Sequence, residues 1–114
     1  MEILGQEFAF SFTDVDDLER YEAAREKLAA VDTQTGAPAQ IIRRECAGIR
    51  DFVTDLFGEG AYERLCSNPG DYKQNLEVLF AVGDAYQAAS AEMEKMQADM
   101  KKRLAKYTVA KRRT

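Results

Sequence analysis

The chain has 114 residues, of which 46% are hydrophobic and 32% charged, a composition typical of one folded domain rather than of a disordered segment. It contains no histidine and no glycine-rich phosphate loop, which excludes Cys-His and Ser-His nucleophiles and the common nucleotide-binding motifs. The net charge is -4, and residues 1–100, with 20 acidic and nine basic residues, are acidic enough to disfavour phosphate binding by the body of the protein. Because these catalytic and nucleotide-binding motifs are absent, we expect a single non-enzymatic domain, residues 1–114, with no cofactor and no metal.

The N-terminal residues predict a short β-hairpin over residues 2–12. Residues 2–4 form the first strand, Gly5 and Gln6 suit a two-residue turn, and the second strand alternates so that three phenylalanines share one face: Phe8, Phe10 and Phe12. A lone two-stranded ribbon is only marginally stable in water. The aromatic face must therefore pack on the helices or pair with another subunit, and we treat it as a candidate partner-binding surface.

Two amphipathic helices follow, over about residues 14–31 and 38–57. Thr13 or Asp14 caps the first helix, and acidic residues in its first turn favour the positive end of the helix dipole. Pro38 suits the first turn of the second helix, which carries the densest apolar stripe of the chain and ends at Gly58. We expect this second helix to form the centre of the core.

A short helix over residues 59–66 precedes a turn at residues 67–70, after which Asp71 caps a long helix. The chain has two cysteines, Cys46 and Cys66, and each lies on a predicted helix among apolar neighbours. We expect buried free thiols, with a disulfide or a metal-binding pair as the alternative.

The long helix, residues 71–107, has apolar or small residues at alternating spacings of four and three, with no proline: Tyr72, Leu76, Leu79, Gly83, Tyr86, Ser90, Met93, Gln97, Met100, Leu104 and Tyr107. A helix over residues 72–107 is roughly 54 Å long, at about 1.5 Å per residue. A compact chain of this size has a diameter of only roughly 35 Å. The helix should therefore project beyond its domain and present either an oligomer interface or a docking surface for another helix.

The two halves of this helix differ in composition. Residues 81–91 are rich in alanine, glycine and serine, so we expect this half to pack on the second helix, with Gly83 at a close backbone crossing. The other half supplies the candidate residues for partner binding or oligomerisation: Met93, Met96, Met100, Leu104 and Tyr107. Methionine adapts to varied surfaces, although these methionines could instead fill gaps in an ordinary core or mediate self-association.

Charge is distributed unevenly along the chain. All 20 acidic residues lie within positions 1–100, whereas seven of the 16 basic residues lie in the last fourteen: Lys101, Lys102, Arg103, Lys106, Lys111, Arg112 and Arg113. The first of these complement the negative end of the helix dipole. The rest, in a tail over residues 108–114, are either a solvated end or a contact for an acidic partner or nucleic acid.

The N-terminal hairpin of sequence EILGQEFAF, the acidic helix start DVDDLERYE at residues 14–22 and the helical remainder resemble the small tail assembly chaperones of long-tailed phages and prophages of Gram-positive bacteria. The resemblance spans about the first thirty residues and the overall helical layout. It implies a non-enzymatic, self-associating protein that binds the tape measure protein, a very long helical polypeptide, and keeps it soluble while tail tube subunits are recruited. It carries over no catalytic residues.

We therefore expect a mainly α fold with a short N-terminal hairpin and a long C-terminal helix. Apolar runs are too short for a membrane span and no secretory signal is present, so we expect the chain to stay in the cytosol where it is made. The resemblance implies the host bacterial cytoplasm as the location and absence from the mature virion. One alternative function is a structural head-tail or tail subunit that forms a ring. A further alternative is a small nucleic-acid accessory protein that uses the basic tail, which would bind with a steep dependence on salt.

Overall fold

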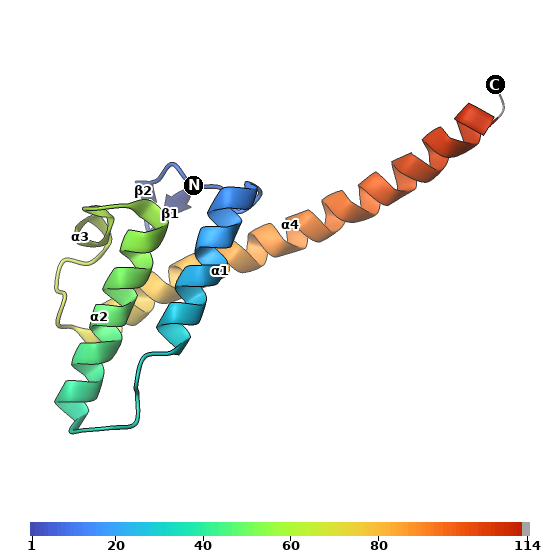
Figure 1. Ribbon diagram of the computed structural model, residues 1–114. Helices are drawn as coiled ribbons and strands as arrows, with labels where there is room; N and C mark the ends of the chain where they lie inside the picture. The colour runs from blue at the N-terminus through green and yellow to red at the C-terminus, as the bar shows by residue number, and fades with distance from the viewer. Residues whose placement is uncertain (113–114) are drawn as a thin grey trace.

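One helix, α4 (Tyr72–Arg112), runs the length of the molecule and projects far beyond the other elements (Figure 1). This computed structural model describes residues 1–112, with side chains through residue 108. The molecule measures 71 × 30 × 20 Å and has a radius of gyration of 19.1 Å, against about 13 Å for a compact chain of this size. The predicted projection is confirmed, and α4 extends past residue 107, the predicted end.

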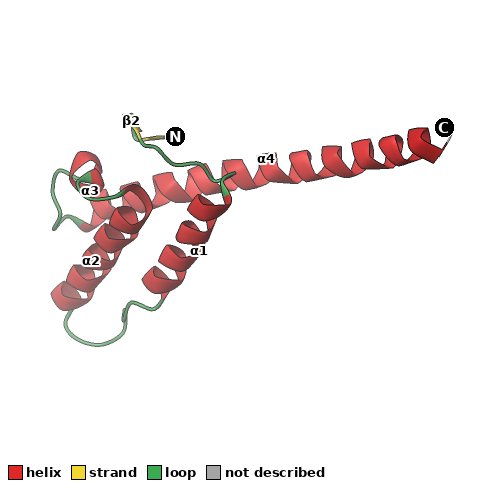
Figure 2. Ribbon diagram, turned by 45° about the horizontal axis from the view of Figure 1, so that its top comes forward, coloured by secondary structure: helices red, strands yellow, loops and turns green. Residues whose placement is uncertain are grey.

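The remaining elements form a head around the first half of α4. Figure 2 shows the two longer head helices inclined to α4, with the hairpin lying over the head. The mainly α class is confirmed, and the elements of the head are β1 (Glu2–Ile3), β2 (Gln6–Glu7), α1 (Val15–Ala29), α2 (Pro38–Phe57) and α3 (Ala61–Leu65).

The helix ends follow from local side-chain chemistry, as predicted. The Asp14 carboxylate accepts a hydrogen bond from the Asp17 backbone N–H at 3.1 Å, which caps α1. The Asp71 carboxylate accepts from the Gln74 N–H at 3.2 Å and caps α4 in the same way. At the end of α2, Gly58 has a φ of 94°, a conformation that glycine adopts without a steric penalty.

The hairpin is shorter than predicted, and its turn is displaced by one residue. β1 pairs with β2 so that Ile3 faces Gln6, and the turn residues are Leu4 and Gly5, with φ angles of 48° and 80°. Two successive positive φ angles define the turn whose twist matches a hairpin. The second strand ends at Glu7, and beyond it the Phe10 N–H donates to the Phe8 carbonyl at 2.9 Å, a tight turn rather than a continued ladder.

The head core lies between the N-terminal segment and all four helices. From α4 it receives Val78 and Val82, both 0% exposed, with the polar Asn75 beside them. We call the predicted series of residues at spacings of four and three in α4 the predicted seam. Its members in this half, such as Leu76 and Gly83, are only half-buried. The buried face of α4 is therefore rotated away from the predicted seam, because apolar residues occupy both sides of the helix between residues 76 and 82.

Close helix packing occurs at Gly48 rather than at Gly83. A Cβ atom added to Gly48 in α2 would lie 2.9 Å from Val31 Cγ2 and 3.1 Å from Leu28 Cδ1, so glycine allows α1 to approach α2. A Cβ added to Gly83 meets no other group of the described residues within 4 Å. The prediction that a backbone crosses at Gly83 is wrong, because the crossing depends on how α1 and α2 pack and not on the composition of α4.

A buried hydrogen-bond cluster joins α3 to the beginning of α4. The Tyr62 hydroxyl donates to Asn75 Oδ1 at 2.6 Å, and Asn75 Nδ2 donates to the carbonyls of Pro69 at 3.1 Å and Asp71 at 2.8 Å. Both side chains are at most 1% exposed, and desolvation raises the pKa of Tyr62. We call these contacts the Tyr62–Asn75 cluster; they fix the position from which α4 starts.

Candidate interaction surface

The projecting half of α4 carries its apolar residues on the same side as the buried residues of the head half. Eighteen residues make about five turns of an α-helix, so two residues 18 apart have nearly the same orientation about its axis. Each residue of the stripe follows a core-facing residue by this interval; the pairs are Asn75 and Met93, Val78 and Met96, Val82 and Met100, Tyr86 and Leu104, and Ala89 and Tyr107. We call the second members of these pairs the α4 stripe.

The α4 stripe becomes more exposed with distance from the head. Met93 is half-buried at the edge of the head. The outer four residues are each more than half exposed: Met96 at 51%, Met100 at 52%, Leu104 at 54% and Tyr107 at 58%. All five predicted residues are therefore brought onto one face, and no other described segment of the chain covers its outer part. Contiguous exposed apolar side chains of this size are typical of an interaction surface.

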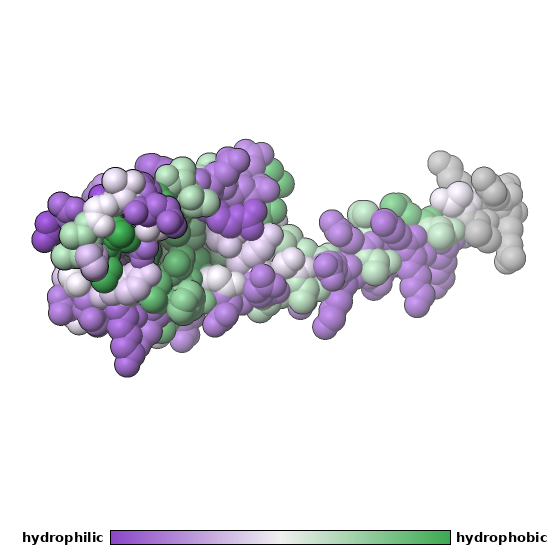
Figure 3. All heavy atoms as spheres, turned by 90° about the horizontal axis from the view of Figure 1, so that it is seen from below, coloured by the Kyte–Doolittle hydropathy of each residue, from purple (hydrophilic) through white to green (hydrophobic). Residues whose placement is uncertain are grey.

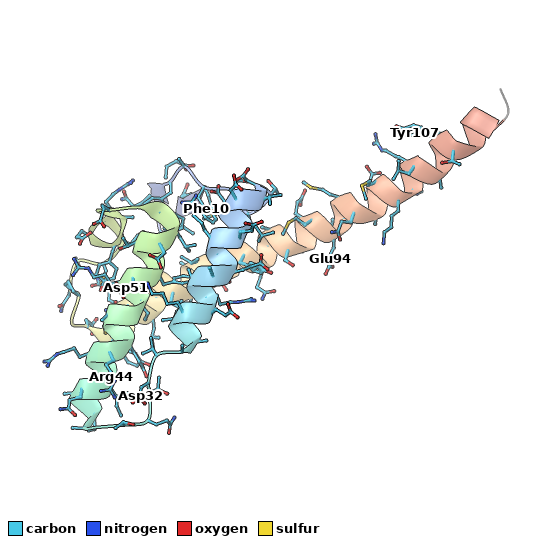
Figure 4. The ribbon with its side chains drawn as sticks, viewed as in Figure 1. Phe10, Asp32, Arg44, Asp51, Glu94 and Tyr107 are labelled. Carbon is cyan, nitrogen blue, oxygen red and sulfur yellow. The ribbon has the colours of Figure 1, made fainter. Side chains whose placement is uncertain are left out.

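Charged residues, with some alanines and other polar residues, occupy the rest of the projecting helix. Figure 4 shows Glu94 and Tyr107 projecting from opposite sides of α4, and Figure 3 shows many hydrophilic side chains along the projecting part, with hydrophobic ones among them. Four basic residues of the predicted electrostatic tail are exposed: Lys101, Lys102, Arg103 and Lys106. Arg103 Nε lies 3.0 Å from Asp99 Oδ2 within the same helix. The side chains of Lys111, Arg112 and Arg113, also predicted to belong to this tail, lie outside the described residues.

The predicted binding role of the three N-terminal phenylalanines requires correction. Phe8, Phe10 and Phe12 are 6%, 5% and 3% exposed, because their rings pack within the head. Phe8 stacks on Phe57 with ring centroids 4.6 Å apart, and Phe12 contacts Tyr86 edge-on at 5.5 Å. The aromatic face thus lies on the helices, which was one of the two expected arrangements, and it offers no free surface to a partner.

The head also contains an open apolar groove that the sequence did not reveal. It has a volume of about 500 Å³ and lies between α1 and α4, with Leu28, Phe52, Leu79 and Phe80 in its wall. Phe80 is 59% exposed. The sequence feature that could have indicated this groove is Phe80, a phenylalanine outside the predicted seam. Phe80 and Met96 are 16 residues apart, so the groove and the α4 stripe lie on different sides of α4.

Both cysteines are buried free thiols, as expected. Burial is the main reason that the pKa of Cys46 is raised, which disfavours the reactive thiolate. Among the described residues, no group of three or more Cys, Asp or Glu side chains has the arrangement of a metal site.

The fold is that of a small helical protein with a head and one projecting helix. The chain belongs to DUF6673, a family of unknown function, whose family model matches residues 4–114. No curated protein and no solved structure matches the chain. Within the described residues, none of the helices combines the length and the apolar character needed to cross a membrane.

Proposed function

We propose that this protein is a phage tail assembly chaperone that binds apolar helical segments of a tape measure protein through the α4 stripe. The observation that carries the proposal is that the outer α4 stripe is exposed although it lies on the same side of α4 as the residues buried in the head. The tape measure protein is suggested by the resemblance of the N-terminal thirty residues and the helical layout to such chaperones. By the same resemblance, the complex would recruit tail tube subunits in the host cytoplasm.

The physical chemistry of the stripe suits a helical partner. An amphipathic helix binds another apolar helix through residues at spacings of three and four, which is the spacing from Met93 to Tyr107. Three of the five stripe residues are methionines, whose unbranched side chains adapt to different partner sequences. A protein that binds many segments of one long polypeptide needs this tolerance more than it needs a single complementary pocket.

The direct test is co-expression with a tape measure protein encoded in the same genome, followed by measurement of how much of that protein stays soluble and co-purifies. Met93, Met96 and Met100 are replaced together by lysine. We expect binding to be lost, because three charges would be buried in an apolar interface. Circular dichroism should show the helical content and the head unchanged.

The matched control places three lysines on the opposite side of the same helix segment, in the variant A91K/A98K/A105K. These alanines are exposed and recur every seven residues, so the added charge is equal but leaves the stripe intact. Retained binding in the control and loss in the methionine variant would support the proposal. Equal binding by both variants, or unfolding of the methionine variant, would contradict it, and a stable ring of fixed size formed without any partner would instead favour a structural tail subunit.

A further inference from the structure

We infer that the projecting halves of α4 from two copies of this chain pair antiparallel, with the α4 stripe of each covered by the other near Met100. The inference concerns the free protein and does not rest on the proposed function. It follows from three observations: the uncovered stripe, the division of charge along the projecting helix, and the residues along one edge of the stripe.

The stripe has the spacing of a two-helix coiled coil. Met93, Met100 and Tyr107 recur every seven residues, and Met96 lies between the first two; Arg103 takes the corresponding position in the second repeat, with Leu104 beside it. In an antiparallel pair centred between residues 98 and 99, Met96 and Met100 meet Met100 and Met96 of the other copy. Met93 then lies beside Leu104 of the other copy, and Tyr107 extends just beyond the partner's stripe. Most of the exposed apolar surface is then covered by an identical surface.

The charges of the projecting helix fall into two halves of opposite sign. Residues 91–99 contain three acids and one lysine, whereas residues 101–108 contain four basic residues and no acid. A parallel pair would place the basic half of one helix beside the basic half of the other. An antiparallel pair places each basic half beside an acidic half, which makes this orientation electrostatically favourable.

The edge of the stripe supports the same orientation. The residues one position before Met93, Met100 and Tyr107 lie along one edge of the α4 stripe; they are Glu92, Asp99 and Lys106. In a twofold antiparallel pair, this edge meets the same edge of the other helix running in the opposite direction. Glu92 of each copy then lies opposite Lys106 of the other. At the centre, the Asp99 carboxylate is neutralised within its own chain by Arg103, at 3.0 Å. A parallel pair brings Glu92 opposite Gln97 and forms no such ion pair.

Pairing and partner capture would use the same residues. A helix of another protein would therefore have to displace the second copy, and the free protein would keep its stripe out of water until that partner is present. The α4 stripe, from Met93 to Tyr107, is only about 21 Å long at 1.5 Å per residue. We expect a weak, concentration-dependent dimer, because short helical interfaces are marginal and readily exchanged.

The first experiment is sedimentation equilibrium of the full chain without any partner, at concentrations up to about 1 mM. We expect a monomer–dimer equilibrium that M100K abolishes, because it places two lysines at the centre of the seam. A98K adds the same charge to the opposite, exposed side of α4 and should dimerise like the native chain. A native chain that stays monomeric throughout, or equal dimerisation of the two variants, would overturn the inference.

A charge exchange tests the orientation. E92K and K106E each place like charges opposite one another at two equivalent points, so each should weaken the dimer by about tenfold. The double variant E92K/K106E restores opposite charges in an antiparallel pair and should recover most of this loss. Failure of the double variant to recover dimerisation would rule out the antiparallel arrangement. Because no partner is present, failure here leaves partner binding, measured by co-purification, as a separate result.

Discussion

The two halves of α4 have the same helical geometry and the same apolar face, but their surroundings differ. Over the head half, Val78 and Val82 are 0% exposed, whereas Met96 and Met100, which follow them by 18 residues, are 51% and 52% exposed. Nothing in the local conformation separates the two halves. The comparison shows that an amphipathic pattern defines a face, while the neighbouring elements decide whether that face is core or surface.

The sharpest test of this comparison replaces two equivalent positions with lysine. V82K puts a charge at a site with no solvent exposure and should lower the free energy of unfolding by about 4 kcal/mol or more, enough to unfold much of the head. M100K, at the equivalent position five turns later, should change it by less than about 0.5 kcal/mol. Urea unfolding followed by circular dichroism at low protein concentration measures both values. Similar losses in the two variants would mean that the projecting stripe is part of the core.

The Tyr62–Asn75 cluster provides the second test, at the base of α4. N75A removes the acceptor of the Tyr62 hydroxyl and the donor to two carbonyl groups, and should destabilise the head by about 2–4 kcal/mol. Y62F removes only the hydroxyl and should have a smaller effect, of about 1–2 kcal/mol. Urea unfolding of both variants gives the comparison. Equal losses would show that the bonds from Asn75 to Pro69 and Asp71 contribute little.

Replacement of the two helical glycines by alanine should change the stability of the head in opposite directions. G83A should stabilise the head by about 0.5–1 kcal/mol, because alanine favours helix and the added methyl group meets open space. G48A should destabilise it, since its methyl group would lie 2.9 Å from Val31 Cγ2. Thermal unfolding followed by circular dichroism measures the two shifts. A lower melting temperature for G83A would restore the prediction of a close crossing at Gly83.

The smallest expected effect concerns pH. The Ser11 N–H and the Arg20 side chain lower the pKa of Asp17 in the folded protein. A carboxylate with a lowered folded pKa stabilises the fold above its unfolded pKa of about 3.9, and this contribution is lost as the pH falls through the folded value. D17N should therefore lose less stability than the native chain between pH 7 and pH 3 in urea titrations. E22Q, on the exposed side of the same helix, should behave like the native chain.

The helix ends and the projection could be predicted from the sequence because they depend on local chemistry and on length. Asp14, Pro38, Gly58 and Asp71 each act within one turn of their own position. The displaced hairpin turn was missed because Leu4 adopts a positive φ, which leucine does rarely and without any marker in the sequence.

Other features depend on contacts between distant segments and could not be deduced from spacing. Gly48 marks the crossing of α1 and α2 only once both helices are placed. The sequence predicts an aromatic face made of Phe8, Phe10 and Phe12, but it does not decide whether the helices or another subunit cover this face. Every residue of the α4 stripe was predicted from the sequence. The sequence did not show that the stripe lies on the same side of α4 as the buried Val78 and Val82.

The position of the Tyr62–Asn75 cluster has a mechanical consequence. From Asn75 to Tyr107, α4 is roughly 48 Å long, and its base is held by three hydrogen bonds of the Tyr62–Asn75 cluster. A tilt of about 10° at Asn75 would move the Tyr107 end through about 8 Å, about one and a half helical turns. Together with the core contacts of Val78 and Val82, the buried Tyr62–Asn75 cluster therefore sets the direction in which Leu104 and Tyr107 project, although neither Tyr62 nor Asn75 touches them.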